Sequence, residues 1–442
     1  MSANALPTVV IGAGPAGLAA AAHLASRDLP AVVLEAGPAA GAAVSEWGHV
    51  RLFSPWSELM DPTARQFLET TDWAAPDDEA YPTGAEWVAG YLQPLADALG
   101  VVRYDHQVTA VARASRDRLV SSGRDDAPFT LHVTGPDGPA HLQATAVVDA
   151  SGTWTGPNPL GGDGVPAIGE RDAADQISYR IPDLADPATK ARYAGKHVVV
   201  AGTGASAKGA LIGLTRLADT GTSVTWLVRR SRVNDAFAGS GQDELPERGA
   251  LGQQAAAAVA DGPVTTLNGF RTATVNRQAD GRLTIGSFDV QQVDDVNEVI
   301  VLTGFRPNLD MLAEVRLDLD PVLQAPRQLA PLIDPNEHSC GTVYPHGANE
   351  LAQPETGFYL VGMKSYGRAT SFLALTGFEQ TRSVAAAIAG DHEAAARVEL
   401  TLPDTGVCGG SGDFDDITAD AGGCCGAPVA TELITLGSRP TA

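Results

Sequence analysis

Two glycine-rich turns, each directly after an apolar run, constrain the fold of this 442-residue chain more than any other feature. The first reads Gly12-Ala13-Gly14-Pro15-Ala16-Gly17 and follows Thr8-Val9-Val10-Ile11. The second reads Gly202-Thr203-Gly204-Ala205-Ser206-Ala207 and follows His197-Val198-Val199-Val200-Ala201. Between a strand and a helix, such glycines let the backbone approach a pyrophosphate. One such turn is a weak signal, but two in one chain predict two dinucleotides bound side by side.

Apolar patterning extends each turn into a strand–helix–strand unit. Around the first turn we expect strands Val9–Ile11 and Ala31–Leu34 with a helix over Ala16–Ser26, and residues 185–230 repeat this pattern. Nearly continuous apolar strands are typical of parallel sheets that are covered on both faces. Further short strands are expected at three places between the two units, at Arg118–Val120, Phe129–Val133 and Ala146–Ala150.

After the second unit the chain is expected to return to the first domain. Residues 356–362 read as a strand and turn, and residues 372–388 read as a long helix. We therefore predict an α/β fold with two Rossmann-like three-layer dinucleotide-binding domains and a Cys/Gly-rich C-terminal tail. The predicted bounds are 1–185 with 295–400 for the first, discontinuous domain, 186–294 for the inserted domain and 401–442 for the tail.

Composition and charge exclude several classes of protein. A formal net charge of -23 argues against nucleic acid as a partner, because such proteins carry a basic face. No run of about 18 apolar residues suggests a membrane span. Three of the four cysteines lie in the last 35 residues, which is no secreted disulfide framework. We expect a cytoplasmic monomer or homodimer that acts on a small molecule.

The first turn is predicted to hold FAD, since the N-terminal turn of two usually binds the flavin nucleotide. Gly12 makes the tight turn, Gly14 lets the backbone approach the pyrophosphate, and Gly17 lets the helix pack on the strand. Pro15 and Ala16 open the helix, whose N–H groups and dipole favour phosphate. The Glu35 carboxylate, at the end of the second strand, is expected to accept hydrogen bonds from ribose.

The second turn is predicted to hold NADPH rather than NADH. Gly202, Gly204, Ser206 and Ala207 form the turn, and the strand after its helix ends in Arg229-Arg230-Ser231-Arg232. NAD binders carry an acid at that place, whereas guanidinium groups bind a 2′-phosphate. The alternative for this cluster is a solvated basic turn.

The motifs resemble those of the two-dinucleotide-domain flavoproteins, especially the flavin-containing monooxygenases. Val147-Val148-Asp149-Ala150-Ser151-Gly152-Thr153-Trp154 resembles the linker out of their FAD domain, and Thr303-Gly304-Phe305-Arg306-Pro307-Asn308 resembles the return linker shared with pyridine-nucleotide disulfide reductases. The resemblance implies further flavin contacts at Trp47, Arg51, Ser54, Val108, Gly152, Thr153, Trp154, Gly304 and Gly362. The aromatic residues among them are alternatively ordinary core.

Two departures from the family pattern bear on the chemistry. The His of the monooxygenase signature is absent, with Ile177 near its place. No CxxC or CxxxxC pair lies near either turn, so a disulfide-reductase mechanism lacks its redox pair.

One subgroup is a closer resemblance, namely the flavoproteins encoded in bacterial arsenic-resistance operons. It is carried by Arg306-Pro307-Asn308, by Glu337-His338-Ser339-Cys340-Gly341-Thr342, by the stretch from Val361 to Arg368 and by the Cys424-Cys425 pair. The resemblance implies an NADPH- and FAD-dependent oxidation of trivalent arsenic. Our hypothesis for this reaction is that O2 oxidises arsenite or methylarsenite to As(V) through a C4a-hydroperoxyflavin.

Thiols and cations supply the remaining candidates. Cys408, Cys424 and Cys425 are predicted ligands for As(III) or another thiophile, because soft centres prefer thiolates. Cys340, Arg51 and Lys364 are the predicted catalytic residues, with Arg368 as a further cation and His338 and His346 as candidate proton donors. Each of them is alternatively a structural, core or surface residue.

Three other functions stay open at this point. The first is a monooxygenase that oxygenates nitrogen or sulfur, and the second is an NADPH-dependent thiol or metal reductase. The third is not an enzyme but a redox sensor that binds a thiophile.

Overall fold

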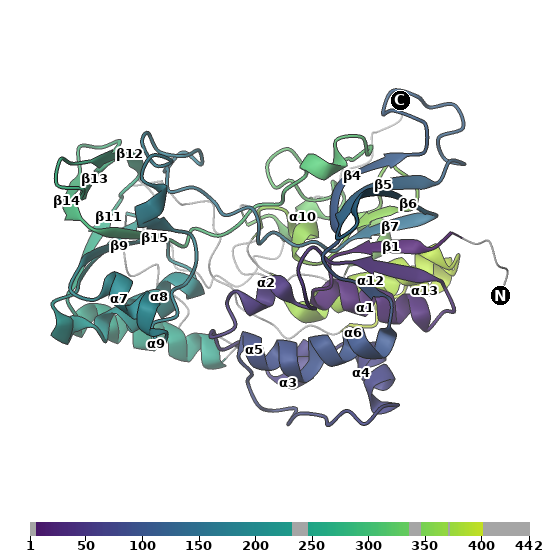
Figure 1. Ribbon diagram of the computed structural model, residues 1–442, viewed down its shortest axis with the longest axis horizontal. Coiled ribbons are helices and arrows are strands. Elements are labelled where there is room, and N and C mark those ends of the chain that lie inside the picture. Colours follow the sequence, from purple (N-terminus) through teal and green to yellow (C-terminus); the bar gives the residue numbers. More distant parts are fainter. Residues whose placement is uncertain (1–5, 232–245, 336–345, 370–371, 401–442) are drawn as a thin grey trace, which may run out of the picture.

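The computed structural model describes residues 6–231, 246–335, 346–369 and 372–400, which form two lobes side by side (Figure 1). Each lobe has a five-stranded parallel sheet, with helices on one face and a three-stranded antiparallel sheet on the other. The predicted α/β class with two Rossmann-like units is confirmed. The predicted tail, 401–442, lies outside the described residues.

The sheet of the first lobe has the strand order β16-β7-β1-β2-β3. Thr8 lies opposite Ala31 on one side and opposite Ala146 on the other, so the carboxyl ends of the central strands meet at one edge. The strands are β1 (Thr8–Ile11), β2 (Ala31–Leu34), β3 (Val102–Arg103), β7 (Ala146–Asp149) and β16 (Phe358–Leu360).

Alternation along β1 explains the layers of this lobe. Val10 packs with the helices, whereas Val9 and Ile11 pack against the antiparallel sheet. That sheet consists of β4 (Gln107–Arg113), β5 (Phe129–Gly135) and β6 (Gly138–Ala144). The helices are α1 (Pro15–Ala25), α2 (Ala42–Ser45), α3 (Trp56–Leu59), α4 (Pro62–Glu69), α5 (Gly84–Trp87), α6 (Gln93–Leu99), α10 (Ala330–Ile333), α11 (Ala348–Leu351), α12 (Ala374–Ile388) and α13 (His392–Ala396).

The second lobe repeats this arrangement with the strand order β11-β10-β9-β15-β8. Val198 and Val200 of β9 pack toward α8, and Val199 and Ala201 pack toward the antiparallel strands. Its elements are β8 (Ile177–Ser178), β9 (His197–Ala201), β10 (Ser223–Val228), β11 (Val264–Asn268), β15 (Glu298–Val301), β12 (Thr272–Arg277), β13 (Leu283–Ser287), β14 (Gln292–Val296), α7 (Pro187–Tyr193), α8 (Ala205–Thr215) and α9 (Pro246–Asp261).

The second lobe is an insertion between β7 and β16 of the first sheet. Its sheet takes in β8 and β15, which lie just outside the predicted 186–294 segment. Both strands are short and join the sheet only through tertiary pairing, β15 with β9 and β8 with β15, so local patterning does not assign them to a lobe. The domain bounds stay a prediction.

The strand expected at Arg118–Val120 is wrong. These residues form turns, and the Leu119 side chain is 89% exposed. The strand that precedes β5 and pairs with it is instead β4 (Gln107–Arg113), and Val111 and Phe129 face one core there. None of the described helices is long and apolar enough to cross a membrane.

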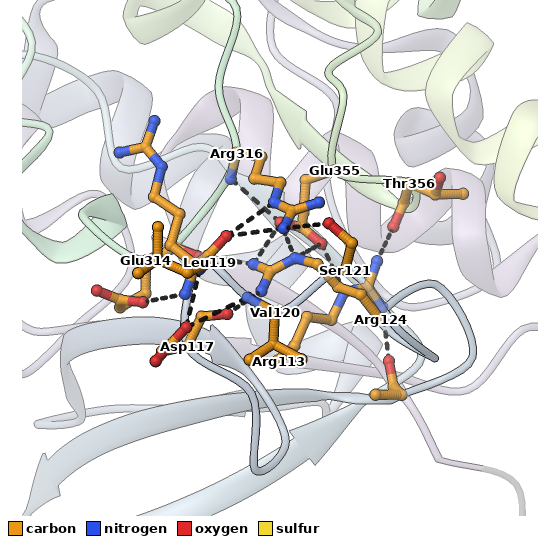
Figure 2. Close-up of polar contacts among 12 residues, drawn as sticks. Arg113, Asp117, Leu119, Val120, Ser121, Arg124, Glu314, Arg316, Glu355 and Thr356 are labelled. Atoms are coloured by element: carbon orange, nitrogen blue, oxygen red, sulfur yellow. Dashed lines mark hydrogen bonds and ion pairs between the residues drawn. The ribbon is translucent and has the colours of Figure 1, made fainter.

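A buried charge cluster holds the loop between β4 and β5 in place (Figure 2). The Glu355 carboxylate accepts from Arg113 Nε at 2.8 Å and from Arg124 Nη2 at 2.7 Å, and all three side chains are at most 3% exposed. It also accepts from the backbone N–H of Arg316 at 3.1 Å. Arg124 donates further to the carbonyls of Asp117 and Glu314. One carboxylate therefore ties this loop and the 314–316 segment to the entry of β16.

Burial raises the pKa of the Glu355 carboxyl, but the hydrogen bonds from Arg124 and Arg113 outweigh it, and the net pKa lies below the ordinary value. A depressed pKa in the folded state stabilises the fold above the unfolded-state pKa. This contribution is lost as the pH falls through the folded-state pKa.

We expect Glu355→Gln to lower the free energy of unfolding by about 3–5 kcal/mol, because it leaves two buried guanidinium groups without a counter-charge. Urea unfolding at neutral pH measures the change. The difference from the wild type should shrink as the pH falls below about 4.3, the ordinary Glu pKa. Asp318→Asn is the control, since its ion pair with Arg327 is about half exposed and worth at most about 1 kcal/mol. Equal losses from the two variants would contradict this account.

Candidate functional site

The first glycine turn lies at the carboxyl end of β1, where its backbone packs against the backbone of Ala150 and Ser151. Gly12 has φ +98°, and a Cβ there would lie 3.0 Å from the Ala150 carbonyl oxygen. A Cβ on Gly17 would lie 1.9 Å from the Gly12 carbonyl oxygen. A Cβ on Gly14, by contrast, would meet no protein atom within 4 Å. The fold itself requires Gly12 and Gly17, whereas the space above Gly14 fits a pyrophosphate at the N-terminus of α1.

Glu35 is bonded to this turn. Its Oε2 accepts from the Ala13 backbone N–H at 2.6 Å, and its Oε1 accepts from Gly37 N–H at 2.8 Å. The carboxylate therefore shapes the turn and lies at its edge. Its contact with ribose stays a prediction.

The second glycine turn repeats this geometry. Gly202 has φ +120°, and a Cβ there would lie 2.2 Å from the Leu302 carbonyl oxygen, while a Cβ on Gly204 would meet nothing within 4 Å. Ala207, in place of a third glycine, is fully buried beside Val200 and Leu211. Ser206 is exposed at the start of α8. The space above Gly204 is open in the same way as the space above Gly14, and the second dinucleotide predicted there stays a prediction.

Trp226 supports the second turn, and sequence reasoning assigned it no role. Its indole Nε1 donates to the Gly202 carbonyl oxygen at 2.7 Å, and its ring is fully buried. Directly after β10, which ends at Val228, Arg229 is exposed and Arg230 is half-buried, while Arg232 lies outside the described residues. The place of Arg229 and Arg230 after β10 agrees with their predicted role, which stays a prediction.

The two linkers between the lobes pair with each other. Asn158 N–H donates to the Gly304 carbonyl at 2.9 Å, and Arg306 N–H donates to the Gly156 carbonyl at 2.8 Å. Gly152, four residues before Gly156, has φ +68° and open space where its Cβ would lie. The linkers thus form one ribbon that leaves the first glycine turn, because Ser151 Cα would lie 3.1 Å from a Cβ on Gly12.

Arg180 joins this ribbon to the first lobe, and sequence reasoning missed it. Its guanidinium carbon lies 3.9 Å from the centroid of the Trp154 ring, and its Nη2 donates to the Trp154 carbonyl at 3.1 Å. Its Nε lies 3.4 Å from Glu46, directly after α2. Trp154 also packs on Phe305 of the other linker, with ring centroids 4.9 Å apart, and Thr153 is buried beside it in sequence. No local pattern predicts contacts among residues so far apart in sequence.

The other predicted flavin residues are spread along the first lobe. The Trp47 ring packs on Gly84, where a Cβ would lie 2.9 Å from it. Arg51 is exposed, its guanidinium donates to the Tyr81 carbonyl, and Ser54 is half-buried. The Val108 side chain is buried in the core, so only its backbone is open to the predicted contact.

Lys364 forms a buried ion pair with Asp149. Its Nζ lies 2.7 Å from Asp149 Oδ2 and 3.0 Å from Ser151 Oγ, and both charged side chains are at most 2% exposed. Asp149 ends β7 directly beside Ile11. The pair therefore supports the strand edge under the first turn, and any effect of Lys364 on a ligand passes through Asp149 and Ser151.

Gly362 begins the segment that contains Lys364 and approaches the first turn. A Cβ on Gly362 would lie 2.8 Å from Ala16 Cβ, and its N–H donates to Gln380 Oε1 at 2.7 Å. Gln380 Nε2 also lies 2.8 Å from Nε2 of His346, and the His346 side chain is buried. His346 thus belongs to a polar network in the core, and its role as a proton donor stays a prediction.

All four cysteines, Cys340, Cys408, Cys424 and Cys425, lie outside the described residues, as does His338. Within the described ranges, no group of three or more His, Cys, Asp and Glu side chains is placed to hold a metal ion. The predicted thiol site and the catalytic role of Cys340 stay predictions.

The open space at Gly14 and Gly204 generates a paired test. Gly14→Val puts a side chain into the first cradle at a place where its Cβ meets no protein atom within 4 Å, so we expect wild-type stability with at least about tenfold weaker FAD binding. Gly204→Val should keep the flavin and weaken NADPH binding by a similar factor. Flavin absorbance per protein, NADPH titration and thermal unfolding measure these effects. Full flavin content in Gly14→Val would refute the assignment of the first cradle.

Solved structures with this fold include enzymes of two kinds. Bacillithiol disulfide reductase from Bacillus cereus matches with a TM-score of 0.63 at 18% identity, over 88% of this chain and 99% of its own. A variant flavin monooxygenase from Stenotrophomonas maltophilia matches with a TM-score of 0.59 at 21% identity, over 88% of this chain and 99% of its own. L-lysine 6-monooxygenase from Pseudomonas syringae matches with a TM-score of 0.54 at 17% identity, over 89% of this chain and 100% of its own. At these identities the likeness shows the shared fold.

No curated protein matches the chain. Residues 9–341, which include both glycine turns and both linkers, match the family model of the pyridine nucleotide-disulphide oxidoreductases. The chain therefore belongs to this family of flavin-dependent oxidoreductases, and it is an enzyme with FAD and NADPH as its cofactors.

Proposed function

We propose that this protein is a monooxygenase that uses NADPH and O2 to oxidise trivalent arsenic, as arsenite or methylarsenite. The observation that carries the proposal is the pair of open cradles, at Gly14 and Gly204, on two sheets joined by one ribbon of linkers. Such a pair suits a relay of electrons from one dinucleotide to another.

The cysteine distribution favours O2 over a protein disulfide as the next electron acceptor. No cysteine precedes Cys340, so neither glycine turn is followed in the sequence by the CxxC or CxxxxC pair of a disulfide reductase. When bound, the flavin accepts a hydride from NADPH and passes the electrons on. The chain's own part is to hold both cofactors at the helix N-termini and to keep water from the reacting atoms.

The arsenic assignment rests on sequence resemblance at Arg306-Pro307-Asn308, at the Val361–Arg368 stretch and at the C-terminal thiols. The balanced reaction takes arsenous acid, O2, NADPH and a proton to arsenic acid, water and NADP+. One oxygen atom enters the product, and the other leaves as water. Oxygenation of an amine or a sulfide is the second candidate, favoured by the fold of the lysine monooxygenase above. A cytoplasmic site of action, where NADPH is available, is part of the proposal.

Purified, FAD-loaded protein in air provides the direct test. We expect arsenite or methylarsenite to accelerate NADPH oxidation, with As(V) formed in equal amount and one atom from labelled O2 in the product. Reactions with an amine or a sulfide in place of arsenic are the comparison. Arsenic-independent oxidation that yields only hydrogen peroxide would refute the arsenic assignment and leave the oxidoreductase.

The basic residues after β10 test the choice of NADPH. We expect the double variant Arg229→Ser/Arg230→Ser to raise the KM for NADPH about tenfold or more, and to change kcat/KM for NADH little, because only NADPH carries the 2′-phosphate. Arg216→Ser, an exposed arginine at the end of α8, is the matched control. If the double variant lost kcat/KM equally with NADPH and with NADH, the 2′-phosphate of NADPH would have to bind elsewhere.

A further inference from the structure

Two guanidinium groups from distant parts of the chain converge on Gly164. Arg306, in the return linker, donates from Nη2 to the Gly164 carbonyl oxygen at 3.0 Å. Arg368 Nη2 would lie 3.8 Å from a Cβ on the same glycine. The loop that contains Gly164 precedes β8, so three segments meet at this point between the lobes.

Neutral groups hold the Arg306 guanidinium and the Arg368 backbone in place. Arg306 Nε donates to Asn158 Oδ1 at 2.8 Å, so its anchors are an amide and a carbonyl. The backbone N–H of Arg368 donates to the Leu323 carbonyl at 2.7 Å. Gly367, just before it, has φ +58° and lies so close that a Cβ would meet the Leu323 carbonyl oxygen at 2.0 Å. The backbone of Arg368 is therefore fixed, while its side chain is exposed.

Neither guanidinium has a carboxylate partner among the residues that the structure describes. This is unusual in a chain with 53 acidic and 30 basic residues. Burial, and then the charge of Arg368, lower the pKa of Arg306 from its ordinary value. The two like charges repel each other, and an anion bound between them would relieve this repulsion.

The arginine pair is connected to the first glycine turn along two short paths. Arg368 closes the segment that begins at Gly362, which lies against Ala16. Arg306 bonds to Gly156, on the linker that leaves the turn at Ser151. A ligand between the two guanidinium groups would lie at the junction of the lobes.

We propose that Arg306 and Arg368 bind a small tetrahedral oxyanion of the arsenate and phosphate class at this junction. The two guanidinium groups are planar forks of N–H donors that match the oxygens of such an anion. Hydrogen bonds between charged groups of this kind are stronger than those between neutral groups. The natural ligand is the pentavalent oxyanion that the reaction releases. That identity rests on the proposed function, whereas the anion site does not.

The test is calorimetric titration of FAD-loaded full-length protein with sodium arsenate and with sodium phosphate. Saturating NADP+ is present, and chloride keeps the ionic strength constant. We expect arsenate and phosphate to bind at one site, and Arg368→Gln to weaken both by about tenfold or more. The Arg368 side chain makes no bond in the described structure, so this variant should fold normally. Arg306→Lys keeps the charge but loses the fork, and we expect a smaller loss.

Arg216→Gln is the matched control, because it also removes one exposed guanidinium. Unchanged affinity in Arg368→Gln, or an equal loss in Arg216→Gln, would overturn the proposal. The titration is repeated without NADP+. Oxyanion binding that is seen only without NADP+ would overturn the proposal as well, since the pair would then hold a phosphate of the dinucleotide. Arsenate binding without arsenite-dependent NADPH oxidation would keep the site and refute the proposed function instead.

Discussion

The approach of backbone to backbone at the two glycine turns is the constraint on which the rest of this structure depends. At Gly17 and at Gly202 a Cβ would lie 1.9 Å and 2.2 Å from a carbonyl oxygen of the protein itself, so neither position has room for a side chain. Gly14 and Gly204 face open space instead. The same turns thus close the packing of strand and helix and leave room for a phosphate-bearing ligand.

Buried polar contacts carry this constraint to the rest of the first lobe. The Lys364–Asp149 pair supports the strand edge under the first turn, and Gly362 brings its segment against Ala16. Across the junction, Arg180 stacks on Trp154 and reaches Glu46. These contacts and the paired linkers together join the two lobes.

Features encoded by neighbouring residues could be predicted from the sequence, and features that join distant residues could not. The glycine turns, their strands and helices and the insertion of the second lobe follow from contiguous patterns. Arg180 and the Glu355 cluster depend on contacts between segments more than 100 residues apart, as from Glu46 to Arg180 and from Arg113 to Glu355. Leu119 and Val120 misled the strand assignment because their apolar side chains point to solvent.

We propose that NADPH, held at the second turn, reduces FAD, held at the first. The most direct test is rapid anaerobic mixing of the FAD-loaded protein with NADPH, followed by the visible absorbance of the flavin. The account predicts full bleaching of the flavin, with a rate that saturates with NADPH and is slower with equal NADH. A flavin that stays oxidised in the presence of saturating NADPH would contradict it.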